Sequence, residues 1–127
     1  MTQPRDRLGR PLRGQSAQEL SFPQVPERTF IDVPTAWNET LNYLAQDLPF
    51  HVHEVFEQRW RCAPVTEKEL WQALAQWGAA LTHLARGNSQ GARALALRSQ
   101  ETLALAEHIP PYMDLSLIRE SQRELLA

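Results

Sequence analysis

The chain has 127 residues, of which 43% are hydrophobic and 22% charged, proportions that are ordinary for one globular domain. Its formal net charge of −2 argues against nucleic-acid binding by the chain as a whole, and its single cysteine, Cys62, rules out an internal disulfide. Because the N-terminus lacks the apolar core of a secretory signal and no run approaches about 18 apolar residues, we expect a cytoplasmic protein without a membrane span.

Residues 1–33 are predicted to form a mobile, extended N-terminal arm. Four of the nine prolines lie here, and helical periodicity is absent. The end of the arm is expected to lie across the body and bury Phe22 and Val25. Arginines at positions 5, 7, 10 and 13, set against Asp6, give its first part a charge of +3. Such a charge suits phosphates or an acidic partner, although a solubilising tail is the simpler interpretation.

Residues 34–127 show a helical pattern almost without interruption and are predicted to form one domain. Steps of three and four residues mark the inner face of a first helix, formed by Trp37, Leu41, Leu44 and Leu48. Thr35 is its expected N-cap. A second helix is expected to begin at Asp47 or Leu48. Pro49 fits its first turn, and the helix should end before Pro64.

A third helix is predicted to start at Thr66-Glu-Lys-Glu69, which has the pattern of a capping box. It should end at Arg86-Gly87, a basic last turn followed by a C′ glycine. Its expected buried residues are Leu70, Trp71, Leu74, Trp77, Leu81 and Leu84. Asn88 or Ser89 should cap a fourth helix that runs to about Glu107.

A fifth helix is expected after Pro110 and Pro111, capped by Asp114, with Leu115, Ile118 and Leu125 facing inward. The chain is therefore predicted to be all-α, with about five helices in a compact antiparallel array. Leu44-Ala-Gln-Asp47 and Leu84-Ala-Arg-Gly87 lie 40 residues apart, each near a helix end. Two copies without a shared consensus are too few to establish a repeat array.

The strongest functional pattern is His53, Glu57 and Trp60, at i, i+4 and i+7 in HVHEVFEQRW. This spacing places an imidazole, a carboxylate and an indole on one helix face. An antiparallel hairpin centred on residue 64 would bring His53 level with Ala75 or Gln76. His83 would lie about 10 Å further along, at 1.5 Å per residue.

One interpretation of this face is the edge of a divalent-metal site. His53 and Glu57 supply two ligands, whereas an open catalytic zinc site usually has three protein ligands and a water. Candidates for the third are Gln76, His83, His51 and Glu54, in decreasing order. The sequence also lacks the second histidine of the HExxH zincin signature, which argues against a zincin protease.

Two other interpretations remain open. In one, His53, Glu57 and Gln76 form a buried polar network that fixes the register of the helices, with Trp60 packed over them. In the other, the same network lines a pocket for a small ligand. A carboxylate-held histidine can also act as a general base, but no nucleophile accompanies it. The chain is therefore more simply a binding protein than an enzyme, and an enzyme here would be a metal-dependent hydrolase.

Three segments resemble the domain of unknown function 309 family. His53, Glu57 and Trp60 match its H-x-x-x-E-x-x-W/Y motif, and the helix from Leu70 to Leu84 is similar to the one that follows, with Gln76 and His83 at its recurrent polar positions. Arg86-Gly-Asn-Ser-Gln-Gly-Ala92 resembles its G-N-x-x-G-A corner, which gives Gly87, Asn88 and Gly91 a structural role.

The resemblance covers roughly residues 36–118. Residues 5–12 are similar to an extension of actinobacterial members, whereas the approach to the motif, Asp47-Leu-Pro-Phe-His-Val52, departs from the family pattern. The resemblance implies the site but no activity, since metal binding has only been suggested for the family. The sequence therefore predicts a small-ligand or divalent-metal binding domain, with a helical protein-interaction module as the alternative.

Overall fold

The computed structural model describes residues 24–127, which form five α-helices and one short 3₁₀ helix without strands. The elements are α2 (Val33–Ala45), α3 (Pro49–Cys62), η1 (Val65–Glu67), α4 (Lys68–Ala85), α5 (Ser89–Leu103) and α6 (Ser116–Leu126). The all-α prediction is therefore confirmed. Within the described residues, no helix is both long enough and apolar enough to cross a membrane.

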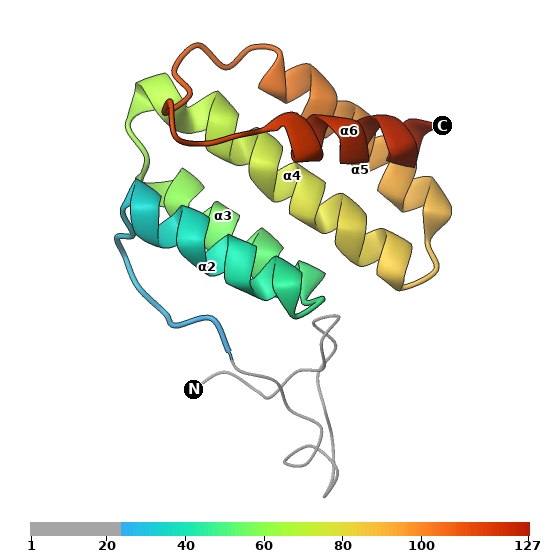
Figure 1. Cartoon of the computed structure of the whole chain (residues 1–127), viewed down its shortest axis with the longest axis horizontal. Helices are drawn as coiled ribbons and strands as arrows, with labels where there is room; N and C mark the ends of the chain where they lie inside the picture. The colour runs from blue at the N-terminus through green and yellow to red at the C-terminus, as the bar shows by residue number, and fades with distance from the viewer. Residues whose placement is uncertain (1–23) are drawn as a thin grey trace, which may run out of the picture.

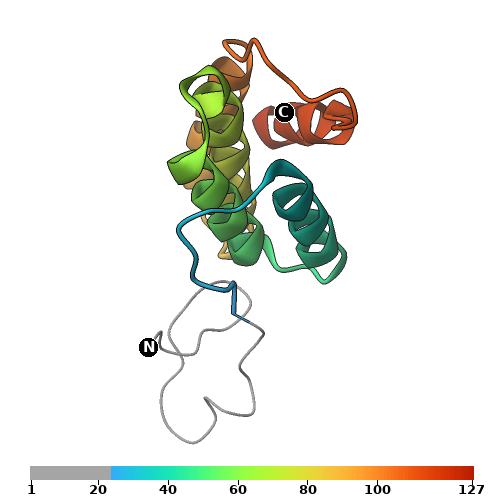
Figure 2. The same cartoon turned by 90° about the vertical axis from the view of Figure 1, so that its left-hand side faces the viewer.

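The helices form two layers. α3, α4 and α5 pack side by side, whereas α2 and α6 lie on one face of this row and are separated from each other (Figures 1 and 2). α2 packs mainly on α3, and α6 packs mainly on α5. α4 is therefore flanked on that face by two helices with space between them.

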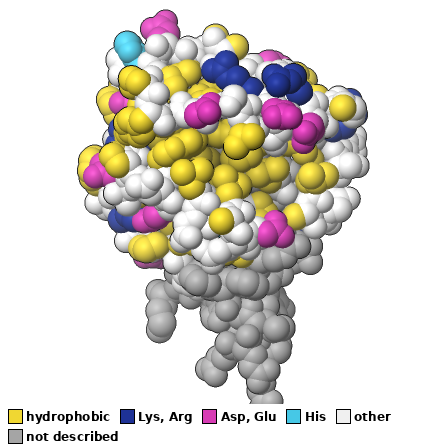
Figure 3. Space-filling view, viewed as in Figure 1, with side chains coloured by type: hydrophobic (Ala, Val, Ile, Leu, Met, Phe, Trp, Pro, Cys, Tyr) yellow, Lys and Arg dark blue, Asp and Glu magenta, His cyan; other side chains and the backbone are white. Residues whose placement is uncertain are grey.

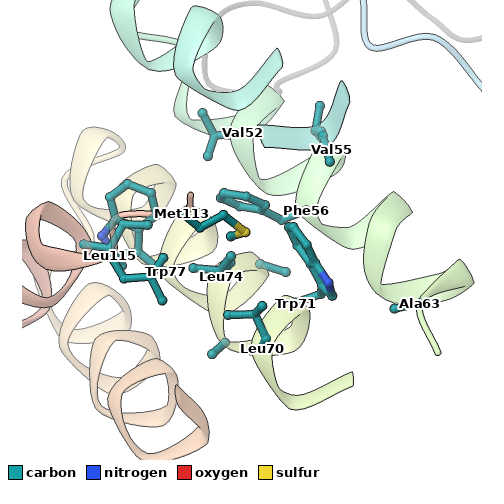
Figure 4. Packing of buried hydrophobic residues seen from close by; sticks show 14 of the residues in the cluster. Val52, Val55, Phe56, Ala63, Leu70, Trp71, Leu74, Trp77, Met113 and Leu115 are labelled. Carbon is teal, nitrogen blue, oxygen red and sulfur yellow. The ribbon is translucent and has the colours of Figure 1, made fainter. Parts of the chain in front are cut away.

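The core lies between the two layers and along the boundary of α3 and α4. Figure 4 shows Val52 and Phe56 of α3 near Leu74 and Trp71 of α4, and the rings of Phe56 and Trp71 are 6.1 Å apart. Met113, in the loop before α6, belongs to the same buried cluster.

The predicted inner face of α2 is confirmed only in part. Leu48 is buried, and Trp37 and Leu44 are partly buried against the core, whereas Leu41 is 47% exposed. The fully buried residues of α2 are Ala36, Thr40 and Tyr43, because the helix meets mainly α3. At the end of α4, Leu84 is 50% exposed rather than buried.

Two helix starts were predicted at the wrong residue. Asp32, not Thr35, caps α2, and its carboxylate accepts the backbone N–H of Thr35 at 2.9 Å. The expected capping box at Thr66 falls in the 3₁₀ helix η1, and no side chain caps α4. Glu67 accepts the indole N–H of Trp71 at 2.9 Å instead.

The later helices also depart slightly from the predicted bounds. α5 ends at Leu103 rather than near Glu107, because the N–H groups of residues 105 and 106 turn back to carbonyls three residues earlier. Asp114 lies just before α6, where its carboxylate accepts the N–H of Ser116 at 3.0 Å. Leu115 and Ile118 are buried as expected, and Leu125 is partly buried.

The corner after α2 and the corner after α4 share one backbone geometry. After α4, Gly87 has φ +82°, its N–H donates to Leu84, and the N–H of Asn88 donates to His83. After α2, Asp47 has φ +56°, its N–H donates to Leu44, and the N–H of Leu48 donates to Tyr43. Both corners are Schellman motifs, 40 residues apart, so the sequence echo corresponds to two similar helical hairpins.

Residues 24–32, here called the strap, lie against α2 and α3. Val25 and Ile31 are buried, which confirms the prediction for Val25, whereas Phe22 lies outside the described residues. Arg28 donates to Glu39 at 2.9 and 2.5 Å and to Gln58 at 2.9 Å. These charge-assisted hydrogen bonds fasten the strap to both helices.

Candidate ligand pocket on helix α3

His53 and Glu57 face each other one turn apart on α3. Their closest atoms, His53 Nε2 and Glu57 Oε2, are 3.0 Å apart. The other carboxylate oxygen of Glu57 pairs with Arg61, one turn further on. The i, i+4, i+8 spacing on one helix therefore produces a row of alternating donors and acceptors.

Helix α4 fixes the orientation of the His53 ring. Nδ1 of His53 lies 2.9 Å from the carbonyl oxygen of Ala75, and a carbonyl can only accept, so Nδ1 carries a proton. Nε2 lies beside the Glu57 carboxylate, so both ring nitrogens of His53 have a partner, one on α4 and one on α3.

Gly78 brings α4 close to His53. A Cβ at position 78 would lie 2.8 Å from the Cα of His53, a distance that real side chains do not tolerate. The glycine is what lets the imidazole reach the α4 backbone.

A pocket of about 330 Å³ lies beside this row, within the size range of small-molecule sites. The strap forms one wall, held by a 2.7 Å hydrogen bond from Gln58 to the carbonyl of Pro26. The side chains of His53 and Glu57 are 25% and 32% exposed, so the row is open to solvent. The lining residues are Gln24, Val25, Glu27, Phe50, His51, His53, Glu54, Glu57, Gln58 and Arg61.

The charges of this α3 pocket are mixed but predominantly acidic. Glu27, Glu54 and Glu57 contribute three carboxylates. Arg61 is the one Lys or Arg in the lining, and its side chain is 65% exposed. Phe50 and Val25 supply apolar surface. The chemistry favours a small polar molecule that presents a cationic or hydrogen-bond-donating group to the carboxylates and an apolar part to Phe50.

Three of the predicted site residues lie elsewhere. Trp60 does not line the pocket, and its ring lies 5.6 Å from the ammonium of Lys68. Gln76 does not line it either, and its side-chain oxygen is buried without a hydrogen-bond partner. His83 lies 3.0 Å from the side-chain amide of Asn88.

Two residues with secondary roles in the prediction do line the pocket. These are Glu54 and His51, and the ring of His51 also lies 5.1 Å from that of Tyr43. Within residues 24–127, no group of three or more His, Cys, Asp or Glu side chains is arranged to hold a metal ion. Among these residues, His53 and Glu57 therefore offer two ligands to a metal ion, without a third.

The corner residues predicted to be structural lie where the sequence placed them. The carboxamide oxygen of Asn88 accepts the N–H of Gly91 at 3.0 Å and so caps α5. A Cβ at Gly91 would lie 2.6 Å from the Asn88 amide. Gly87, Asn88 and Gly91 thus form one corner, and His83 belongs to it.

Arg61, Gln58 and the strap are parts of the site that were not among the predicted site residues. Arg61 could have been found, because it continues the i+4 row from Glu57. Gln58 and the strap could not, because their contacts join residues about 30 positions apart.

Comparison with known proteins supports the family resemblance. Residues 37–95 match the family described as Domain of unknown function (DUF309). The matched segment includes His53, Glu57 and the corner at Gly87, and over these residues the chain is similar to that family. Neither the curated proteins nor the solved structures contain a match.

Proposed function

We propose that this domain binds a small polar ligand in the α3 pocket. The observation that carries the proposal is the solvent-open His53–Glu57 pair in the wall of a 330 Å³ pocket. A pair that served packing alone would be expected to lie inside the core.

The expected ligand carries an amine, a guanidine or a similar donor group. Glu57 holds Arg61 through a solvent-exposed i, i+4 pair, and such pairs contribute only about 0.3–0.5 kcal/mol. A ligand cation can therefore replace Arg61 on Glu57 at little cost. Phe50 would then pack against the apolar part of the same molecule.

A divalent cation is the second candidate for the same site. The Nδ1–H of His53 donates to a backbone carbonyl, as in metal-binding histidines whose other nitrogen is the ligand. Nε2 and Glu57 would then be two ligands, and water would supply the rest. Residues 24–127 offer no third protein ligand, so this version is weaker than the organic ligand.

The alternative is a helical interaction module in which the row is architectural. It is favoured by the closed set of contacts from Ala75 through His53 and Glu57 to Arg61. In that case His53→Ala would lower stability by about 1 kcal/mol through a lost hydrogen bond, and no small molecule would restore it.

The test is a thermal melt of the wild type and Glu57→Gln against small amines, guanidines and divalent metal salts, with a chelator control. A compound at 100 times its Kd should add about 2.7 kcal/mol, or about 10 °C for a chain of this size. We expect a rise for the wild type with at least one compound and little or none for Glu57→Gln.

The matched control is Glu101→Gln, which makes the same change on the exposed side of α5. It should respond as the wild type does. A wild type that responds to no compound, or a Glu57→Gln variant that responds fully, would contradict the proposed site. A response to metals alone, lost with chelator, would select the divalent-cation version.

A further inference from the structure

A second surface lies on the face shared by α2, α4 and α6. Figure 3 shows hydrophobic side chains gathered at the centre of this face, with charged side chains around them. One pocket of about 190 Å³ is lined by Leu44, Leu81 and Leu84. Another of about 440 Å³ is lined by Leu81, Leu84 and Leu125.

The two pockets form one groove across α4. Leu81 and Leu84 line both, so they make a ridge with an apolar pocket on each side. We call the two pockets and this ridge the α4 groove. It shares no lining residue with the α3 pocket and is therefore a separate surface.

Each half of the groove has an acidic residue at its wall. Asp47 lines the smaller pocket, and Glu124 lines the larger one. The Glu124 carboxylate has no ion-pair partner among residues 24–127. Arg93, the basic residue of the lining, donates to the carbonyl of Ala127. The groove therefore suits an apolar segment with basic flanks.

The chain contains such a segment at residues 5–13. It carries four arginines and one aspartate, and its two leucines, Leu8 and Leu12, are four positions apart. In an extended backbone, four residues span about 13 Å, and Pro11 disfavours a helix there. The segment therefore offers two apolar side chains on one stretch of chain, and the groove has two pockets divided by a ridge.

The chain is also long enough for this segment to reach the groove. Gln24 and Phe50 both line the α3 pocket, and Pro49, the residue before Phe50, lines the smaller pocket of the groove. The eleven steps from residue 13 to residue 24 span up to about 36 Å. A domain of about 100 residues has a radius of gyration of about 13 Å, so the tether is long enough.

We propose that residues 5–13 dock in the α4 groove of the same molecule. Leu12 occupies the pocket beside Leu44, and Leu8 occupies the pocket beside Leu125. Arg13 then lies near Asp47, and Arg5 and Arg7 lie near Glu124.

The test is photo-cross-linking in the full chain, with a benzophenone-bearing phenylalanine in place of Leu8 or, separately, Leu12. After irradiation at low micromolar concentration, monomeric adducts are digested and mapped by mass spectrometry. We expect position 12 to link to residues 44–49 or 81–85, and position 8 to residues 81–93 or 121–127. The same group at Gln18, outside the docking segment, should not give these adducts.

Leu84→Gln provides the matched groove variant. Leu84 is half exposed and glutamine is a good helix former, so the melting temperature should stay near that of the wild type. The groove adducts should fall at least fivefold. Adducts that appear only in dimers would assign the groove to a second copy and overturn the proposal. Adducts elsewhere, no adducts, or a yield unaffected by Leu84→Gln would also overturn it.

Discussion

At the residue scale, Gly78 determines how closely α3 and α4 approach. Alanine is the better helix former by about 1 kcal/mol, but its Cβ would lie 2.8 Å from the Cα and 2.9 Å from the N of His53. These are backbone atoms and cannot simply rotate away. We therefore expect Gly78→Ala to destabilise the domain by about 1–3 kcal/mol, measured by urea unfolding.

Ala79→Gly is the control for Gly78→Ala, because it changes only helix propensity one position further on. It should cost about 1 kcal/mol and leave the α3–α4 distance unchanged. A Gly78→Ala variant that is more stable than the wild type would show that propensity outweighs the close approach. The proposed reason for the glycine would then be wrong.

The ionisation of Asp32 makes the unfolding free energy of the domain depend on pH. Hydrogen bonds from the side chain and backbone N–H of Thr35 hold the pKa of Asp32 below its ordinary value. The folded state therefore binds a proton less readily than the unfolded chain. The stabilisation is fully present above the unfolded pKa, about 3.9, and is lost as pH falls through the lower folded value.

Asp32→Asn tests this dependence, because asparagine is an equally good N-cap without the charge. We compare the unfolding free energies of the two proteins from pH 6 to pH 2.5. Relative to the variant, the wild type should lose stability below about pH 4. A difference between them that stays constant over this range would contradict the assignment.

At the element scale, the two Schellman corners differ in the residue at the left-handed position. Gly87 adopts φ +82° without strain, whereas Asp47 adopts φ +56° with a side chain. We expect Asp47→Gly to stabilise the domain by up to about 1 kcal/mol, measured by thermal and urea unfolding. Gly87→Ala, with nothing within 4 Å of its Cβ, should destabilise by about 1–2 kcal/mol through φ alone.

Asp47→Asn separates this backbone effect from the loss of charge in the α4 groove. Asparagine tolerates the left-handed conformation and lacks the carboxylate. If the Asp47→Asn and Asp47→Gly variants gain the same unfolding free energy, the gain comes from removing the charge rather than from the backbone. The proposed strain at Asp47, relative to Gly87, would then be wrong.

The sequence predicted the number and type of helices well, because helix periodicity, prolines and the Gly87 corner are local signals. The residues at which the helices begin were harder to predict. Thr66 and Glu69 have the spacing of a capping box, but Glu67 contacts Trp71 and Arg59, and a 3₁₀ turn forms instead. On α2, Leu41 was wrongly expected to be buried, because periodicity does not reveal which part of a helix face has a neighbour.

The candidate site was predictable only in part for a similar reason. His53, Glu57 and Arg61 lie on one helix, so their spacing places them together. The hairpin register, which placed His53 level with Ala75 or Gln76, is confirmed by the contact of His53 to the carbonyl of Ala75, whereas the side chain of Gln76 does not line the pocket. Contacts to backbone carbonyls and to the strap cannot be predicted from the spacing of residue types.

At the scale of the whole molecule, the two-layer array presents two separate surfaces. The α3 pocket lies between the α3 row and the strap, and the α4 groove lies on the face with α2 and α6. The smaller half of the groove meets the α3 pocket at Pro49 and Phe50. Because the two surfaces are adjacent there, each needs its own measurement in the full chain: amide chemical shifts for ligand binding and cross-links for the docking of residues 5–13.

The ligand site at His53 and Glu57 is tested most directly by titrating the isotope-labelled full chain with small amines and guanidines. The amide chemical shifts are mapped at each step. We expect shifts concentrated in residues 24–28 and 50–61, and loss of these shifts in Glu57→Gln. Shifts confined to the α4 groove, or no saturable shift with any compound, would contradict a ligand site at His53 and Glu57.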